Sequence, residues 1–315
     1  MTRAVLVLIL LITGWLAPAW GQVAAPLLGY LPDGNQVRPV YGIAAAATVA
    51  DPMRTGEDVG HAIAVRDSVL ILEADEGAVS VFTAGVLKYV QGTRNAPDRV
   101  ALSPTGQAAV LWFQSNSTAQ ILSNLAGTPE LRQVDAAFLP ASPTALAVSD
   151  DGQWLAGAWP DGTFAFGPLG EVLQLPVSGG ATAVEFFPRT HDLGLASAGG
   201  LWMVADIGGR TMPQSLWQPA PEETFDAVAV AGSARELYAV TRSGAVLMVS
   251  LERGETTSLD CACQPAGLSR LAGNAFRLTG PVDGAIKLFD ADSAAVLFAP
   301  IRPQDLSRRS GGRSR

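Results

Sequence analysis

Residues that perform nucleophilic catalysis are scarce in this sequence of 315 residues. A serine or cysteine nucleophile needs a base beside it, and the chain contains only two histidines, His61 and His191. The sequence places His191 in a turn between two strands and His61 at the start of a strand, and we expect neither to be a catalytic base. No Gly-x-Ser-x-Gly segment occurs. The sequence therefore predicts no catalytic residues.

The two cysteines, Cys261 and Cys263, are separated by a single residue. On a strand their thiolates would share a face and could form half of a soft-metal site, but four-coordinate sites need further cysteine or histidine, and none lies nearby. We therefore expect a pair of buried or turn cysteines, with a local disulfide as the intermediate possibility in an oxidising compartment. No metal site is predicted. No other cofactor is predicted either, because the glycine pairs Gly179-Gly180 and Gly208-Gly209 lack the lysine of a phosphate-binding loop.

A tight turn between two apolar segments recurs along the chain, and it carries the small, flexible residues that short hairpins prefer. The turns are Asp33-Gly34, Glu76-Gly77, Asn116-Ser117, Asp161-Gly162, Gly199-Gly200, Ser243-Gly244 and Asp283-Gly284. By subtraction of these positions, successive turns lie 38 to 45 residues apart. This spacing indicates a structural repeat of about forty residues.

A strand-like segment precedes six of these turns, and its residues can be compared column by column. The first column holds large aliphatic residues, namely Ile63, Val100, Leu146, Val184, Val228 and Leu268. The second column is small except at Glu185, and the third is apolar except at Arg270. Glu185 and Arg270 lie in columns that point to opposite sheet faces, and their repeats are two apart. The pattern therefore does not require a direct ion pair between them. Since a charge placed against an apolar pattern needs a reason, Glu185 and Arg270 are the candidate ligand-binding residues.

Each repeat divides into four short apolar segments. In one repeat these are Val100–Ser103, Ala108–Phe113, Ala119–Leu122 and Leu131–Val134. A four-stranded unit of about forty residues, repeated radially, is typical of a β-propeller blade, whereas linear β-solenoids usually have shorter repeats with fewer strands. The sequence therefore predicts an all-β fold, a β-propeller of four-stranded blades. Six repeats look complete, and the segments Leu27–Leu31 and Gln36–Ile43 form a partial unit, which we interpret as a reduced seventh blade rather than a cap on a six-bladed ring.

Five tryptophans lie on or beside the predicted strands, and we expect them to pack between blades rather than to form a carbohydrate platform. They are Trp112, Trp154, Trp159, Trp202 and Trp217.

Residues 1–21 have the features of a signal peptide, with Arg3 before an apolar run and small residues up to Gly21. Breaks in the apolar run, including Pro18, leave it too short for a membrane-spanning helix. We expect cleavage near Gly21 and a periplasmic or secreted mature protein without a membrane span.

The rest of the chain is predicted to be a single propeller domain, residues 22–301, followed by a disordered basic tail, residues 302–315, in which Ser, Gly and Arg dominate. The formal net charge is −8, and five arginines lie in that tail, so the propeller itself is more acidic still. An acidic propeller should repel nucleic acid and anionic membranes. We expect a monomer.

Several segments resemble the repeats of WD40 and YVTN-type propellers. Residues 147–155, AVSDDGQWL, are similar to the AVSPDGxxL opening of such blades, and residues 102–106, LSPTG, are a second copy. Residues 283–290, DGAIKLFD, resemble the DGTIKLWD strand, with Phe in place of Trp. The repeats that open at Val184 and Val228 depart from this pattern. The resemblance implies an exported bacterial propeller that serves as a binding scaffold, and it does not fix a ligand.

The sequence thus favours a non-catalytic exported propeller that binds a protein or another ligand through its loop faces. The alternative is a propeller hydrolase or lyase, similar to a lactonase, with a metal site at the central channel. Such an enzyme needs several Asp, Glu, Asn or His side chains that converge there, whereas the inner-strand columns are almost entirely Ala, Val and Leu.

Overall fold

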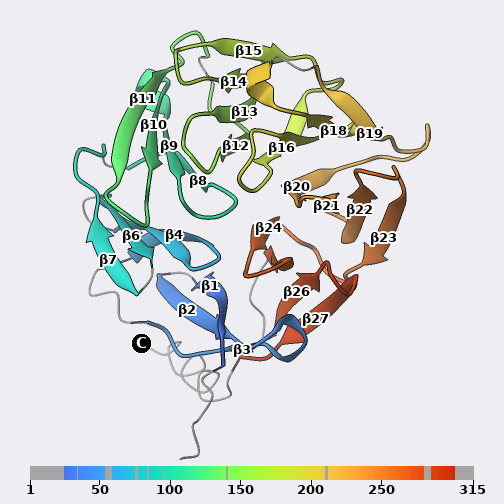
Figure 1. Cartoon of the computed structure of the whole chain (residues 1–315), viewed down its shortest axis with the longest axis horizontal. Helices are drawn as coiled ribbons and strands as arrows, with labels where there is room; N and C mark the ends of the chain where they lie inside the picture. The colour runs from blue at the N-terminus through green and yellow to red at the C-terminus, as the bar shows by residue number, and fades with distance from the viewer. Residues whose placement is uncertain are drawn as a thin grey trace, which may run out of the picture.

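A computed structural model of the chain describes residues 25–33, 35–53, 59–74, 77–83, 85–94, 96–139, 141–209, 212–279 and 285–301. Its strands form seven antiparallel sheets arranged in a ring (Figure 1), so the protein is an all-β, seven-bladed β-propeller. The predicted fold class and the preference for seven blades are confirmed. The predicted signal peptide, residues 1–21, and the predicted tail, residues 302–315, lie outside the described residues.

The strands of each blade are hydrogen-bonded in chain order. The first blade contains β1 (Leu27–Asp33), β2 (Gln36–Tyr41) and β3 (Thr48–Val49). The second contains β4 (Val59–Val65), β5 (Ser68–Glu73), β6 (Val79–Thr83) and β7 (Val86–Tyr89), and the third β8 (Arg99–Leu102), β9 (Ala109–Phe113), β10 (Thr118–Ser123) and β11 (Glu130–Asp135). The fourth contains β12 (Ala145–Val148), β13 (Leu155–Trp159), β14 (Gly162–Phe166) and β15 (Val172–Leu175), and the fifth β16 (Ala181–Phe186), β17 (Leu193–Ser197), β18 (Gly200–Val204) and β19 (Gln214–Trp217). The sixth contains β20 (Ala227–Gly232), β21 (Glu236–Thr241), β22 (Ala245–Ser250) and β23 (Thr256–Asp260), and the seventh β24 (Gly267–Arg270), β25 (Ala275–Thr279), β26 (Ile286–Asp290) and β27 (Ala295–Ala299).

Three short 3-10 helices accompany these strands in the described part of the chain. They are η1 (Ala44–Ala46), η2 (Gln114–Asn116) and η3 (Ile207–Gly209).

The predicted repeat matches these blades closely. In the third blade the four predicted segments agree with β8, β9, β10 and β11 to within one residue at each end. The six first-column residues all lie on the opening strands of their blades, β4, β8, β12, β16, β20 and β24. Four of the predicted turns, from Asn116-Ser117 to Ser243-Gly244, connect the second and third strands of their blades; the other three include residues that the structure does not describe.

The hydrophobic core is divided into layers between neighbouring blades. Seven clusters of buried side chains each combine residues from two adjacent blades, and together they complete the ring. Between the third and fourth blades, Trp112 lies edge-on to Trp159, with ring centroids 5.6 Å apart. Because each sheet is covered on both sides in this way, both of its faces are apolar, as the column pattern predicts.

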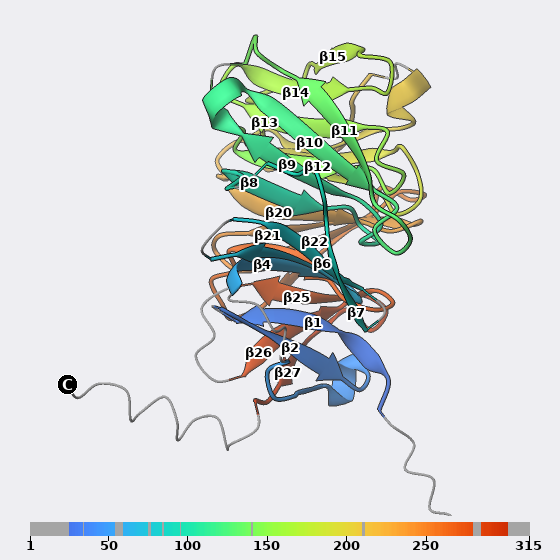
Figure 2. The same cartoon turned by 90° about the vertical axis from the view of Figure 1, so that its left-hand side faces the viewer.

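The first blade lies beside β26 and β27 of the seventh blade (Figure 2), and backbone hydrogen bonds close the ring there. The N–H of Arg66, directly after β4, donates to the carbonyl of Arg270 in β24 at 2.8 Å, so the inner strands of the second and seventh blades meet directly. Both neighbours also bond to β1, since Tyr30 N–H donates to Arg66 O at 3.1 Å and Ala272 N–H donates to Leu28 O at 2.7 Å. Among the described residues the first blade has three strands and no inner strand of its own, and it is the reduced unit that the sequence predicts.

A second contact closes the ring at its outer edge. Ile301, which follows β27 of the seventh blade, forms a parallel bridge with Val49 of β3. The first blade thus depends on a residue from the far end of the chain. Neither β3 nor this bridge was predicted from the sequence.

Candidate functional site

The central channel contains a cavity of about 380 Å³. Its wall is formed mainly by β4, β8, β12, β16 and β24, the inner strands of five blades. Most of the lining side chains are apolar, and they include Ile63, Val65, Val100, Leu102, Leu146, Val148, Val184 and Leu268. The charged ones are Glu185, Arg270 and Arg277. The two residues that break the column pattern therefore both line the channel.

Arg277 reaches the cavity beside the first blade. It lies on β25, the second strand of the seventh blade, where it pairs across the sheet with Ser269 of β24. Its Nη1 donates to the carbonyl of Pro32 in β1 at 3.4 Å, and Pro32 also lines the cavity. The column comparison missed Arg277 because it considered only opening strands.

The structure brings Glu185 and Arg270 together. Nη2 of Arg270 lies 3.9 Å from Oε1 of Glu185, although the two residues belong to the fifth and seventh blades. Arg270 spans the intervening blade, and the same Nη2 donates to the carbonyl of Gly232 at the end of β20. The exposed fractions of the two side chains are 5% for Arg270 and 23% for Glu185. The length of the Arg270 side chain thus allows a contact with Glu185, although the strand pattern assigns the columns of these two residues to opposite sheet faces.

The Arg270 guanidinium keeps hydrogen-bonding capacity that the described protein groups do not use. Its Nε is buried and has no hydrogen-bond partner among the described residues. Its Cζ lies 4.6 Å from the centre of the Phe276 ring, which supplies a cation–π contact but no acceptor oxygen. A buried donor without a partner is costly, so a functional reason for it is worth seeking.

Burial changes the pKa values of these groups. Burial raises the pKa of Glu185 to about 7; the Asp150 carboxylate acts in the same direction, and Arg270 opposes both. Burial lowers the pKa of Arg270, although Glu185 opposes this effect. Burial also lowers the pKa of Arg277 to about 10, against the influence of Asp33. Near neutral pH, the cavity wall therefore holds two cationic groups and one carboxyl that is partly protonated.

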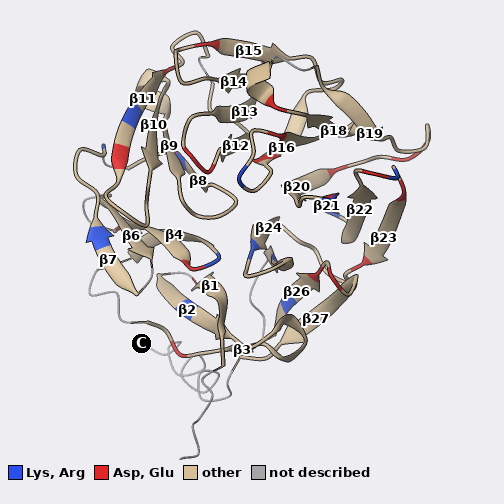
Figure 3. Cartoon of the chain, viewed as in Figure 1, with Lys and Arg blue, Asp and Glu red and all other residues tan. Residues whose placement is uncertain are grey.

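Charged residues also gather on the loops that converge on the channel (Figure 3). A second hollow there is lined by Asp150, Asp151, Arg189, Thr190 and His191. His191 is not the freely solvated turn residue that the sequence predicts, since its Nε2 lies 2.8 Å from Oδ2 of Asp151 and its side chain is 30% exposed.

The order of groups in this hollow is not that of a nucleophile with its base. Ser149 donates its hydroxyl to Oδ1 of Asp151 at 2.6 Å, so the carboxylate stands between the serine and the imidazole. Burial would raise the pKa of Asp151, but hydrogen bonds from Ser149, Gln153 and His191 outweigh it and hold that pKa below its usual value. The arrangement stabilises a charged carboxylate, and the serine hydroxyl donates to that carboxylate rather than to the imidazole.

Asp150 ties three blades together at the same face. Its Oδ1 accepts hydrogen bonds from the backbone N–H and the hydroxyl of Thr105, at 2.9 and 2.6 Å. Its Oδ2 accepts from the backbone N–H of Arg189 at 2.7 Å. These contacts join turns that are about one repeat apart in sequence, so the regular spacing of the turns could have revealed them.

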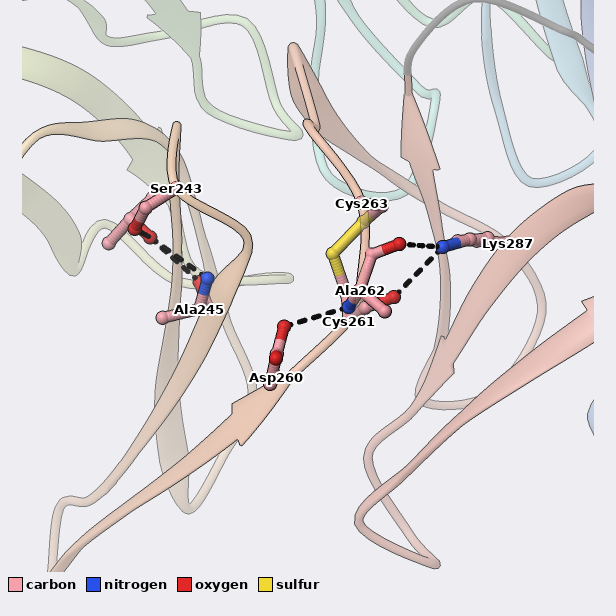
Figure 4. The surroundings of a disulfide bond; sticks show 8 residues. Ser243, Ala245, Asp260, Cys261, Ala262, Cys263 and Lys287 are labelled. Carbon is pink, nitrogen blue, oxygen red and sulfur yellow. Dashed lines mark hydrogen bonds between the residues drawn. A yellow bond between two sulfur atoms is a disulfide. The ribbon is translucent and has the colours of Figure 1, made fainter.

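The two cysteines form a disulfide, Cys261–Cys263, in the connection between β23 and β24 (Figure 4). Of the possibilities that the sequence left open, the local disulfide is the one found. The ammonium of Lys287 donates to the carbonyls of Cys261 and Ala262, and the N–H of Ala262 donates to Asp260 Oδ1 at 2.8 Å. The bonded segment is therefore fixed to the edge of the seventh blade.

The remaining candidates are not brought to the channel. His61 is exposed on β4 of the second blade. Over the described ranges, no three His, Cys, Asp or Glu side chains are grouped so that they could hold a metal ion. The described residues also include no helix that is long and apolar enough to cross a bilayer.

Comparisons with known proteins give the fold and no family. No protein-family model matches the sequence, and none of the curated proteins matches it. Among solved structures, PorZ of Porphyromonas gingivalis is described as an essential bacterial surface component of the type-IX secretion system. It aligns with a TM-score of 0.57 and 15% identity over 89% of this chain, which spans 38% of PorZ.

Two further structures align over nearly the whole chain. A functionally unknown protein from Desulfotomaculum acetoxidans has a TM-score of 0.56 and 13% identity, with coverage of 88% of this chain and 100% of that one. The computationally designed protein Ika8 has a TM-score of 0.53 and 20% identity, with coverage of 87% of each chain. At such identities the likeness shows the propeller fold alone.

Proposed function

We propose that this protein is an exported, non-catalytic binding propeller that takes up its ligand at the central channel and the loops around the channel mouth. The observation that carries the proposal is the charged pair of Glu185 and Arg270, placed 3.9 Å apart in an otherwise mainly apolar cavity. Cavities with mostly apolar walls and a few convergent polar groups are typical of small-molecule sites. Rigid blades with variable loops suit a binding role.

The relationship to WD40 and YVTN-type repeats is part of the same proposal. It is supported by the resemblance of the segments around residues 102–106 and 147–155, which in this chain form the turns after β8 and β12. Export is supported by the pattern of residues 1–21. The likeness to PorZ, a surface component in its own organism, is compatible with an envelope location.

The proposal is tested by isolating the ligand from the natural environment of the protein. Tagged protein of residues 22–315 is incubated with an extract of its own cell envelope, and retained proteins and small molecules are identified by mass spectrometry. We expect a ligand that is retained by the wild type and lost from the double variant Glu185→Gln, Arg270→Met. Arg242→Met is the matched control, because Arg242 is exposed and pairs with Asp226 on the surface.

Two results would contradict the proposal. Retention that is equal in the wild type and in the channel variant would place the binding site elsewhere. Conversion of the retained molecule into a product, with loss of that turnover on addition of a chelator, would favour the hydrolase or lyase instead.

A further inference from the structure

The channel wall carries an excess of buried positive charge. Arg270 is 6% exposed and Arg277 is 8% exposed, so each is more than nine-tenths buried. The only carboxylate that lines the described part of the cavity is Glu185. Asp33 lies close enough to Arg277 to act on its charge, but Asp33 is also bound by Arg38, whose Nε is 3.1 Å from Oδ2. The cavity therefore offers a cationic environment inside a protein of net negative charge.

Arg270 lines the cavity, and one of its donors has no partner in the described protein. One nitrogen, Nη2, is engaged with Gly232 and Glu185, while Nε is buried and unpartnered in the described protein. A guanidinium presents its donors as a planar fork, and the group that matches this fork is a carboxylate or a phosphate. The partner that Arg270 lacks is thus an anionic oxygen group.

The apolar part of the cavity wall favours an organic carboxylate over free phosphate. The first-column side chains Ile63, Val100, Leu146, Val184 and Leu268 surround the cavity and are apolar. A volume of about 380 Å³ is that of a small-molecule site. Free phosphate would leave this apolar surface unused, whereas a ligand with a hydrocarbon body would cover it.

We propose that the central channel binds a small aliphatic carboxylate, with its carboxylate on the Arg270 guanidinium and its hydrocarbon chain against the aliphatic wall. This inference rests on the proposed function, because it assigns a chemical class to the ligand of the same channel. In the free protein Glu185 occupies part of the position that the ligand's carboxylate takes, since it faces the same guanidinium at 3.9 Å.

The competition with Glu185 makes binding depend on pH. Glu185 is faced by Arg270 of β24 and by Asp150 after β12, and Arg270 in turn by Arg66 after β4 and Tyr238 of β21. When Glu185 is protonated it no longer competes with the ligand's carboxylate for the Arg270 guanidinium, which keeps its hydrogen bond to Gly232. An aliphatic carboxylate stays ionised between pH 6 and 8, because carboxyl groups in water titrate near pH 4. Affinity should therefore rise as pH falls from 8 to 6.

The test is calorimetric titration of the mature protein with hexanoate, in parallel with hexanamide, hexylamine and inorganic phosphate. Loss of a charge-assisted hydrogen bond weakens binding by about tenfold or more, so hexanoate should bind at least that much more tightly than hexanamide. Saturable binding in the millimolar range or tighter supports the inference. No saturable binding of hexanoate, or equal or tighter binding of hexanamide, hexylamine or phosphate, would overturn it.

Two variants locate the site. Arg270→Met keeps most of the side-chain volume and removes the charge, and it should weaken hexanoate binding by about tenfold or more. Arg242→Met is the surface control and should leave the affinity unchanged. Glu185→Gln should tighten binding at pH 8 and abolish the increase in affinity between pH 8 and 6. This second variant acts in the opposite direction, so it keeps the inference falsifiable even if Arg270→Met does not fold.

These results separate the two proposals. A neutral or cationic envelope ligand that is lost from the channel variant keeps the proposed function and refutes the carboxylate. Hexanoate affinity that is unchanged in both Arg270→Met and Glu185→Gln refutes the assignment of the anion site to this channel.

Discussion

The carboxyl of Glu185 binds a proton more tightly in the folded protein than in the unfolded chain. Burial raises its pKa from 4.5 to about 7. Below pH 4.5 it is protonated in both states, and between pH 4.5 and 7 only the unfolded chain gains by ionising. This single group should therefore lower the stability of the fold as pH rises through that interval, by up to about 3 kcal/mol.

The variant Glu185→Gln, which stays neutral, removes this dependence. We expect its unfolding free energy to exceed that of the wild type by more at pH 8 than at pH 5, as measured by urea denaturation. Glu255→Gln is the control, since Glu255 is exposed and paired on the surface with Arg253. A difference between Glu185→Gln and the wild type that is the same at both pH values would contradict the prediction.

The disulfide should affect stability locally and leave binding intact. The loop that Cys261–Cys263 closes is very short, so its contribution to the free energy of unfolding is expected to be about 1 to 2 kcal/mol. The double variant Cys261→Ser, Cys263→Ser should have a free energy of unfolding lower by that amount, as measured by urea denaturation, and should bind channel ligands as the wild type does. Wild-type protein kept in dithiothreitol should behave like the variant. Loss of ligand binding in the variant would show that the disulfide shapes the channel.

At this scale the sequence identifies unusual residues better than it identifies their partners. Glu185 and Arg270 are visible because each breaks a column of small or apolar residues. Their contact is not visible, because it depends on the reach of the arginine side chain, which bonds the carbonyl of Gly232 in the sixth blade and approaches Glu185 in the fifth. The contact between Asp151 and His191 is not visible in the likeness of the turns, because likeness does not show which turns are neighbours in space.

Among the elements, β1 is the strand on which the closure of the ring depends. A Cβ atom at Gly29 would lie 2.7 Å from Leu271 Cδ2 and 2.9 Å from the carbonyl oxygen of Arg66. That oxygen accepts the hydrogen bond of Tyr30, so it cannot move away without loss of a closing contact.

Gly29→Ala should therefore destabilise the protein by about 2 kcal/mol, as overpacking does. Gly85→Ala is the matched control, because Gly85 has a positive φ of 80° and no atom within 4 Å of the added Cβ. It should cost about 1 kcal/mol or less, from backbone strain alone. Equal losses in the two variants, measured by chemical denaturation, would mean that crowding at β1 has no effect.

Strand positions follow from the sequence because each strand carries its own apolar alternation and its own turn residues. The third blade is predicted to within one residue on that basis. The closure of the first blade could not be predicted in the same way. It uses backbone groups of Arg66, Ala272 and Ile301, and backbone hydrogen bonds leave no residue pattern.

For the whole molecule, the last described residue, Ile301, belongs to the bridge that closes the ring at its outer edge. A chain that ends at residue 303 keeps β27 and Ile301, and its melting temperature should match that of the full chain, as expected if residues 304–315 are a solvated tail. A chain that ends at residue 294 loses both, and it should melt at a clearly lower temperature because the first blade loses its outer bridge. A large loss already in the longer truncation would make the tail part of the fold.

The bridge between Val49 and Ile301 also fixes an order of events. Segments near the N-terminus are synthesised first, so β1, β2 and β3 exist before the residues that secure them. Until the last blade forms, the edges of this small sheet remain open, and open edges can pair with other chains. Contacts between distant residues also form slowly, because a long loop must close first. We therefore expect closure at the first blade to be a late step of folding, and we expect an incomplete chain to be most open there to strand exchange with a second copy.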